Sequence, residues 1–158
     1  MRMAVVWLAS GFGLGYSPVA PGTAGALLGI VVAALLSPLG LAWQIVLCAI
    51  LAAVAVPICG AAEEHFGRTD DRRIVADEYL TFPLCLLGLP WVTHLWILPV
   101  AFVVNRIMDI VKIPPAHQAQ SLAGGMGIVL DDVISSLYAL AINHAIFALA
   151  MRWFLPVP

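Results

Sequence analysis

Three long stretches of the sequence contain no charged residue, and this limits the folds that the chain can adopt. They cover residues 24–62, 79–104 and 133–151. Hydrophobic residues make up 63% of the chain and charged residues 10%, against roughly 45–50% and 25% in soluble domains. We therefore expect a single membrane-embedded domain over residues 1–158. The net charge of −2 does not favour a nucleic-acid partner, and lipid is the more natural one.

The uncharged stretches predict an all-α, multihelical integral membrane bundle. The sequence SPLG at residues 37–40 indicates a turn, so the first stretch divides into helices at about 24–36 and 41–62. The second of these is long enough to cross a hydrocarbon core of about 30 Å. Residues 133–154 predict a further span, whereas residues 4–15 are too few to cross the membrane alone.

The stretch at residues 79–104 contains three prolines, so it forms either one kinked span or a helical hairpin that enters the membrane and returns. A single span would place Arg106 and Asp77 on opposite faces of the bilayer. A hairpin that turns at residues 88–90 would place them on one face, together with the polar segment at residues 15–23. We expect the hairpin, because it gathers the charged residues into one site.

One charged motif has helical spacing. In NRIMDIVK, Arg106, Asp109 and Lys112 are spaced i, i+3, i+6, which places them on one face of a helix. In a soluble protein such a ladder is more often a set of solvated ion pairs. In a chain this apolar, ionisable residues at a membrane boundary favour a function. Arginine and lysine bind phosphate oxygens, and the aspartate can bind a metal or orient the cations.

Two pairs of adjacent carboxylates complete the acidic residues of interest. They are Asp77–Glu78 in VADEY and Asp131–Asp132 in LDDV. Several carboxylates that converge without cysteine or histidine are hard ligands suited to Mg²⁺. The structural alternative is helix N-capping by Asp131 and Asp132 ahead of the last span. One aspartate would suffice for a cap, so we expect a cation beside the pair.

Two glycine-containing segments could approach an anion. Gly124 and Gly125 in GGMG allow the backbone to come close to a ligand, although such a segment is more often only a turn. Thr23 follows PG at a predicted helix start, where its hydroxyl either caps the helix or contacts a phosphate.

Several common catalytic signatures are absent from the sequence. There is no G-x-S-x-G, no C-x₅-R and no D-x-D, and the three cysteines lie in apolar stretches. Covalent catalysis therefore lacks its usual motifs. Metal-assisted attack of water on a phosphoester, with cations neutralising the phosphate, remains.

The chain resembles the phosphatidylglycerophosphatase A family, bacterial Mg²⁺-dependent membrane enzymes that remove the terminal phosphate of phosphatidylglycerophosphate. Four blocks carry the resemblance in order: GFGLGYSPVAPGTAG, VADE, RIMDIVK and GGMGIVLDD. Each block is weak alone, and the four together are specific. The chain departs from the family pattern at Thr81, Asn105 and Ile113. None of these changes removes a charged site residue. We therefore expect them to affect substrate fit and local backbone shape more than activity.

The resemblance implies a phospholipid substrate, Mg²⁺ as cofactor, and a role for each matched residue. Asp77, Arg106, Lys112 and Asp131 would be catalytic, and Thr23, Arg106 and Lys112 would bind substrate. The metal ligands would be Asp77, Glu78, Asp109, Asp131 and Asp132. The glycine chemistry described above, and not the resemblance, adds Gly124 and Gly125 to the expected substrate-binding residues.

There are two alternatives, one that is not an enzyme and one that is another Mg²⁺-dependent membrane enzyme. A small membrane transporter or channel subunit would share the apolar composition and broken helices, but it predicts polar groups within several spans and an internal repeat, which the sequence lacks. A CDP-alcohol phosphotransferase would need several aspartates and glycines within one short motif, and the sequence contains no such motif.

The expected path also predicts the orientation. The membrane face that carries the site would hold five lysines and arginines, and the opposite face would hold Arg2 and Arg152. The five are Arg68, Arg72, Arg73, Arg106 and Lys112. The positive-inside rule then places the site on the cytoplasmic face of the bacterial inner membrane. Two of the five are site residues, which would be present in either orientation. The count that bears on orientation is therefore three against two. No particular oligomeric state is predicted.

Overall fold

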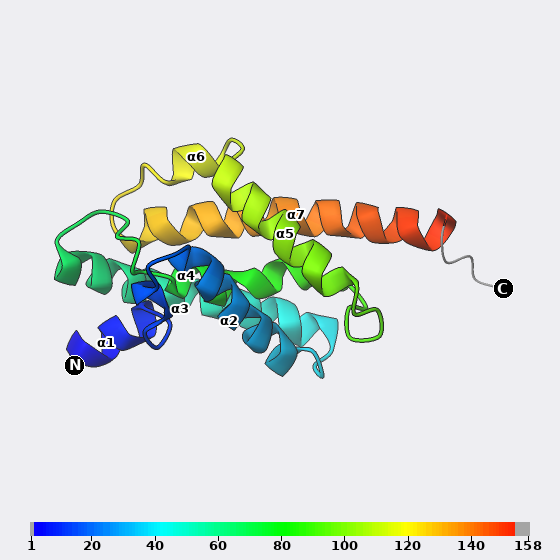
Figure 1. Cartoon of the computed structure of the whole chain (residues 1–158), viewed down its shortest axis with the longest axis horizontal. Coiled ribbons are helices and arrows are strands. Elements are labelled where there is room, and N and C mark those ends of the chain that lie inside the picture. The colour runs from blue at the N-terminus through cyan, green and yellow to red at the C-terminus, as the bar shows by residue number, and fades with distance from the viewer. Residues whose placement is uncertain (1, 154–158) are drawn as a thin grey trace.

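The computed structural model describes residues 2–153, and these residues form helices and no strands (Figure 1). The all-α prediction is confirmed. In chain order the elements are α1 (Arg2–Ala9), the 3₁₀ helix η1 (Leu14–Tyr16), α2 (Pro21–Leu36), α3 (Leu41–Phe66), α4 (Ala76–Thr81), the 3₁₀ helix η2 (Phe82–Leu86), α5 (Ile97–Val111), α6 (Ala116–Ala119) and α7 (Gly125–Trp153).

Helices α3 and α7 are long and apolar enough to cross a membrane. They contain 26 and 29 residues, which correspond to about 39 and 43 Å at 1.5 Å per residue. Only 22% of the most apolar 18-residue window of each helix is buried inside the protein. Most of these side chains therefore need an apolar environment outside the chain, unlike those of a soluble core helix. Phe154, the last residue of the expected final span, lies outside the described residues.

Helix α7 begins at Gly125, eight residues before the start of the expected span at residue 133. Its first turn packs closely against α3: a Cβ on Gly125 would lie 2.0 Å from the carbonyl oxygen of Val56 and 2.6 Å from the amide nitrogen of Gly60. Asp131 and Asp132 therefore lie inside α7, and the N-capping alternative is wrong. Packing between glycines keeps helical a segment whose composition suggests a turn.

The chain between α4 and α5 runs out along α7 and returns. Near its far end, Asn143 of α7 donates a hydrogen bond to the Cys85 carbonyl at 3.0 Å. After the turn at residues 87–96 the chain comes back as α5, where Asn105 accepts a hydrogen bond from Ser136 at 3.0 Å. The end of α5 therefore lies at the end of the molecule where α4 begins.

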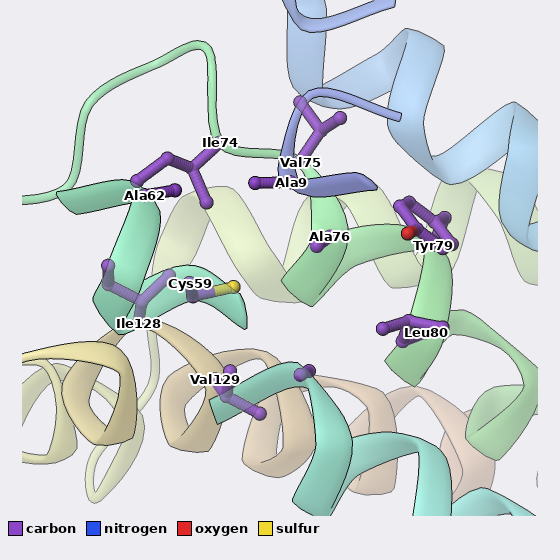
Figure 2. Packing of buried hydrophobic residues seen from close by; sticks show 11 residues of the cluster. Ala9, Cys59, Ala62, Ile74, Val75, Ala76, Tyr79, Leu80, Ile128 and Val129 are labelled. Atoms are coloured by element: carbon purple, nitrogen blue, oxygen red, sulfur yellow. The ribbon is translucent and has the colours of Figure 1, made fainter. Parts of the chain in front are cut away.

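A buried apolar cluster connects α1, α3, α4 and α7 beneath this end of the molecule. Figure 2 shows Ala9, Cys59, Val75, Tyr79 and Val129 in this cluster. The Val75 amide donates to the Ala9 carbonyl at 2.8 Å. Tight packing of this kind fixes the segment that leads into α4.

Helix α1 does not change sides. It has eight residues, about 12 Å, and packs against α3. In Figure 1 the N-terminal end of the chain lies at the same end of the molecule as the end of α3. The position of α1 therefore does not support the expectation that Arg2 lies on the side opposite the charged segments.

Candidate active site

A polar cleft of about 390 Å³ opens between α2, α4, α5, α7 and the loop before α4. Six carboxylates and three cationic side chains line it. Eight of the ten candidate site residues are among its lining residues: Thr23, Asp77, Glu78, Arg106, Asp109, Lys112, Asp131 and Asp132.

Arg106 is held between two carboxylates. Its Nη1 donates to Oε2 of Glu78 on α4, and its Nη2 donates to Oδ2 of Asp109 at 2.8 Å. The Arg106–Asp109 pair confirms that these two residues share a helix face, at i and i+3. The Glu78–Arg106 pair joins residues 28 positions apart. It places the first turn of α4 beside the last turns of α5.

Lys112 reaches Asp131 from outside a helix. Its backbone has φ 48°, a left-handed conformation that ends α5. The expectation that Lys112 continues the helix face of Arg106 and Asp109 is wrong, because the helix ends one residue earlier. The reversal of the chain nevertheless brings its Nζ to 2.5 Å from Oδ2 of Asp131.

Three carboxylates converge as a cation site requires. Asp109, Asp131 and Asp132 each offer an oxygen, and the three oxygens all lie within 4.8 Å of one another. Oδ2 of Asp132 and Oδ1 of Asp77 are buried and have no hydrogen-bond partner among the described residues. Buried carboxylate oxygens are costly unless something compensates their charge. This oxygen-only set fits a hard divalent cation such as Mg²⁺.

Electrostatics at the start of α4 also favour added positive charge. Burial and the neighbouring charge of Glu78 raise the pKa of the Asp77 carboxyl well above its usual range. Burial raises the pKa of Glu78 to about 7, although Arg106 acts in the opposite direction. A bound cation would favour the ionised form of both groups.

The start of α2 forms one wall of the cleft. Helix α2 begins at Pro21 with no side-chain cap, and Thr23 lines the cleft. Gly22 lies so close to Glu78 that a Cβ would sit 1.9 Å from its Oε1. Unpaired amides at a helix N-terminus favour an anion. Thr23 lies in the first turn of α2, at the wall of the cleft.

Gly124 and Gly125 do not line the cleft. Gly125 lies against α3, and Gly124 takes φ 67°, a left-handed conformation before α7. The expected substrate-binding role for these two glycines is therefore not supported by their position. They turn the chain and allow α7 to approach α3.

Eight further lining residues were not among the candidates. Asp70, Arg72 and Ile74 come from the loop before α4, Ala20, Pro21 and Gly22 from the start of α2, and Ile110 and Ile128 from α5 and α7. No motif or spacing marks the loop residues, because only the fold brings the loop before α4 over the cleft.

An acid-lined cleft with anchored cations at one end of an apolar helical protein is the kind of site that a membrane-bound phosphatase needs. The family model of phosphatidylglycerophosphatase A matches residues 7–147. The chain belongs to this family, and the resemblance seen in the four sequence blocks is confirmed. The protein is therefore a phosphoric monoester hydrolase whose substrate class is a phospholipid phosphate. The transporter and phosphotransferase alternatives are set aside.

Two relatives bear the family name, and a third bears another. Phosphatidylglycerophosphatase A of Haemophilus influenzae is 35% identical over 141 residues, which cover 88% of this chain and 86% of the relative. The Escherichia coli enzyme of the same name is 31% identical over 151 residues, 92% and 86%. A Bacteroides thetaiotaomicron protein provisionally named a phosphatidylinositol-3-phosphatase is 34% identical over 142 residues, 85% and 87%. No solved structure matches the chain.

Proposed function

We propose that this protein is a Mg²⁺-dependent phosphatidylglycerophosphatase, which hydrolyses the terminal phosphomonoester of phosphatidylglycerophosphate to phosphatidylglycerol and phosphate. One observation carries the proposal. Asp109, Asp131 and Asp132 converge within 4.8 Å, and the same cleft holds Arg106 and Lys112. A cation site beside two phosphate-binding side chains is what hydrolysis of a phosphomonoester requires.

The cation would be held by Asp109, Asp131 and Asp132, with Asp77 and Glu78 completing the acidic wall. When bound, Mg²⁺ would supply Lewis-acid stabilisation of the charge on the phosphate oxygens. Oδ1 of Asp77 has no hydrogen-bond partner among the described residues. It is available to a cation or to a proton of the attacking water.

The cationic side chains of Arg106 and Lys112 would position the phosphate. Glu78 and Asp109 fix the guanidinium of Arg106, and its buried Nε has no hydrogen-bond partner among the described residues. Asp131 orients the ammonium group of Lys112. Preorganised donors of this kind stabilise a transition state without reorganising during the reaction. The start of α2, with Thr23, would add amide and hydroxyl donors.

A second candidate substrate is phosphatidylinositol 3-phosphate, because one relative takes its name from that activity. Its headgroup shares the essential chemistry of phosphatidylglycerophosphate. Both lipids carry a phosphomonoester at the end of the headgroup and a phosphodiester that joins the headgroup to diacylglycerol. A direct comparison of the two lipids distinguishes them.

We place the chain in the bacterial inner membrane as a multi-pass protein with the cleft at the cytoplasmic face. The turn at residues 87–96 would lie toward the opposite side, so that residues 79–104 form the membrane hairpin. All seven lysines and arginines lie within residues 2–153. Of these, Arg152 alone belongs to the far end of α7. The positive-inside rule favours this orientation.

Release of phosphate by the purified protein tests the proposal. The substrates are phosphatidylglycerophosphate and phosphatidylinositol 3-phosphate in mixed micelles, with Mg²⁺ or with EDTA. Activity that EDTA removes and Mg²⁺ restores is the expected result. Asp131→Asn and Asp132→Asn should lower kcat by about 10²–10³-fold, whereas Glu64→Gln, an exposed charge outside the cleft, should have no effect. Full activity of both aspartate variants at saturating Mg²⁺ would show the site assignment to be wrong.

A further inference from the structure

The loop before α4 presents one arginine to the cleft and turns its neighbour away. Asp71 accepts hydrogen bonds from the Arg73 amide at 3.0 Å, from its Nε at 2.8 Å and from its Nη2 at 2.9 Å. The Arg73 guanidinium also lies 3.9 Å from the centroid of the Phe66 ring. Arg73 is thus fully engaged outside the cleft. Between these two residues, Arg72 lines the cleft.

The backbone around Arg72 is fixed on both sides. The Ile74 amide donates to the Asp71 carbonyl at 2.7 Å, and the Val75 amide donates to the Ala9 carbonyl at 2.8 Å. Gly15 packs so closely that a Cβ there would lie 2.1 Å from the Arg73 carbonyl oxygen. The position of Arg72 at the cleft is therefore a property of an anchored turn.

Arg72 differs from the other two cations of the cleft in having no counter-charge. Arg106 is paired with Glu78 and Asp109, and Lys112 with Asp131. Among residues 2–153, Arg72 forms no ion pair and no side-chain hydrogen bond. Asp70, the carboxylate next to it on the cleft wall, accepts a hydrogen bond from Gln120 at 3.0 Å instead. Arg72 is also exposed, so it lies at the mouth of the cleft and not at its acidic floor.

The substrate chemistry requires a cation at this place. The two candidate headgroups carry a second anionic group, the phosphodiester, on the lipid side of the phosphomonoester. Six carboxylates and three cations line the cleft, so the phosphodiester would meet net negative charge unless a cation is free to pair with it. Arginine is suited to this task because its planar fork donates two parallel hydrogen bonds to phosphate oxygens.

We propose that Arg72 binds the phosphodiester of the lipid headgroup and so selects substrates that carry two phosphates. The inference rests on the proposed function. Arg72 makes this contact equally in the ground state and in the transition state, because the phosphodiester does not react. Its loss should therefore raise KM and leave kcat nearly unchanged.

The test compares Arg72→Gln with Arg68→Gln, which removes an exposed arginine of the same loop that does not line the cleft. The substrates are phosphatidylglycerophosphate, with two phosphates, and phosphatidate, with a phosphomonoester alone, each in uncharged detergent micelles. Phosphatidate is followed as a substrate or, if turnover is slow, as a competitive inhibitor. Folding of each variant is checked by its thermal unfolding midpoint in detergent.

Arg72→Gln should raise KM for phosphatidylglycerophosphate about tenfold or more, the effect of losing one charge-assisted hydrogen bond. KM or Ki for phosphatidate should change less than twofold, Arg72→Lys should recover part of the affinity, and Arg68→Gln should match the wild type. An equal loss for both lipids, or no loss for either, would overturn the inference. Failure of the proposed function gives a different result, because the wild-type protein would then release no phosphate from either lipid.

Discussion

The ammonium nitrogen of Lys112 lies 2.5 Å from Oδ2 of Asp131, a residue of α7 that is 19 positions away. The Asp131 side chain is only 4% exposed, whereas that of Lys112 is 24% exposed. Lysine thus approaches from the open side of the cleft toward a carboxylate that is almost wholly removed from solvent. Loss of the lysine would leave that buried carboxylate without its principal cation.

Lys112→Met should lower kcat/KM for phosphatidylglycerophosphate by about 10²–10³-fold, because it removes a preorganised cation and leaves Asp131 unpaired. Steady-state phosphate release measures this loss. The double variant with Asp131→Asn should be scarcely worse than either single variant, because residues that act as a pair are not additive. Full additivity of the two losses in free energy would show that the ion pair has no role in catalysis.

Gly125→Ala should destabilise the protein by about 1–3 kcal/mol, the usual cost of overpacking a tight contact. The added Cβ would lie 2.0 Å from the Val56 carbonyl oxygen, so α7 and α3 would have to separate. Thermal unfolding in detergent measures the effect. Gly40→Ala is the matched control, since a Cβ on Gly40 would meet nothing within 4 Å. Equal stability of the two variants would contradict this packing role.

The Asp71–Arg73 pair should make stability depend on pH in the acid range. Arg73 lowers the pKa of Asp71 from 3.8 to about 2. Because the pKa in the folded state is the lower one, the pair stabilises the protein fully above about pH 4, and this contribution is lost as the pH falls toward 2. The unfolding midpoint of Asp71→Asn should therefore lie below that of the wild type by a few degrees at most at pH 6. The difference should disappear near pH 2, and a difference that grows on acidification would refute the assignment.

The orientation can be tested at Thr69, an exposed residue of the loop at the cleft end. A cysteine at Thr69, in a variant whose three native cysteines are replaced by alanine, should be protected from an impermeant thiol reagent in intact cells. It should react after permeabilisation, because the positive-inside rule places this loop in the cytoplasm. A cysteine at Thr93, in the turn at the opposite end, should react with the impermeant reagent already in intact cells. Labelling of Thr69→Cys from outside would reverse the topology.

Local sequence patterns predicted most of the helices. They did not predict the helix ends that depend on packing between helices. The absence of charge was enough to predict α2, α3 and most of α7. The start of α7 was not predictable, because glycine is a weak helix former and only contact with α3 keeps Gly125 helical. The end of α5 at Lys112 was missed for a related reason. Helical spacing indicates a shared face, but it does not show where tertiary contacts end the helix.

Seven of the nine charged residues that line the cleft were predictable from chemistry, and their pairing was not. Few roles suit an aspartate or a lysine in so apolar a chain. Which carboxylate meets which cation depends on contacts such as Glu78 with Arg106, across 28 positions. Arg72 was missed for the opposite reason: in a run of charged residues an arginine is unremarkable until the fold places it on the cleft.

Helix α7 sets the register of the whole site. It carries Asp131 and Asp132 itself, it receives α5 through Ser136, and it holds the end of η2 through Asn143. Successive residues of an α-helix are rotated by about 100°. An insertion or deletion of one residue between Asp132 and Ser136 would thus turn the aspartates away from α5 without altering a single charged side chain. The eight residues from Ser136 to Asn143 and the four before them therefore form a segment of α7 whose length must be kept.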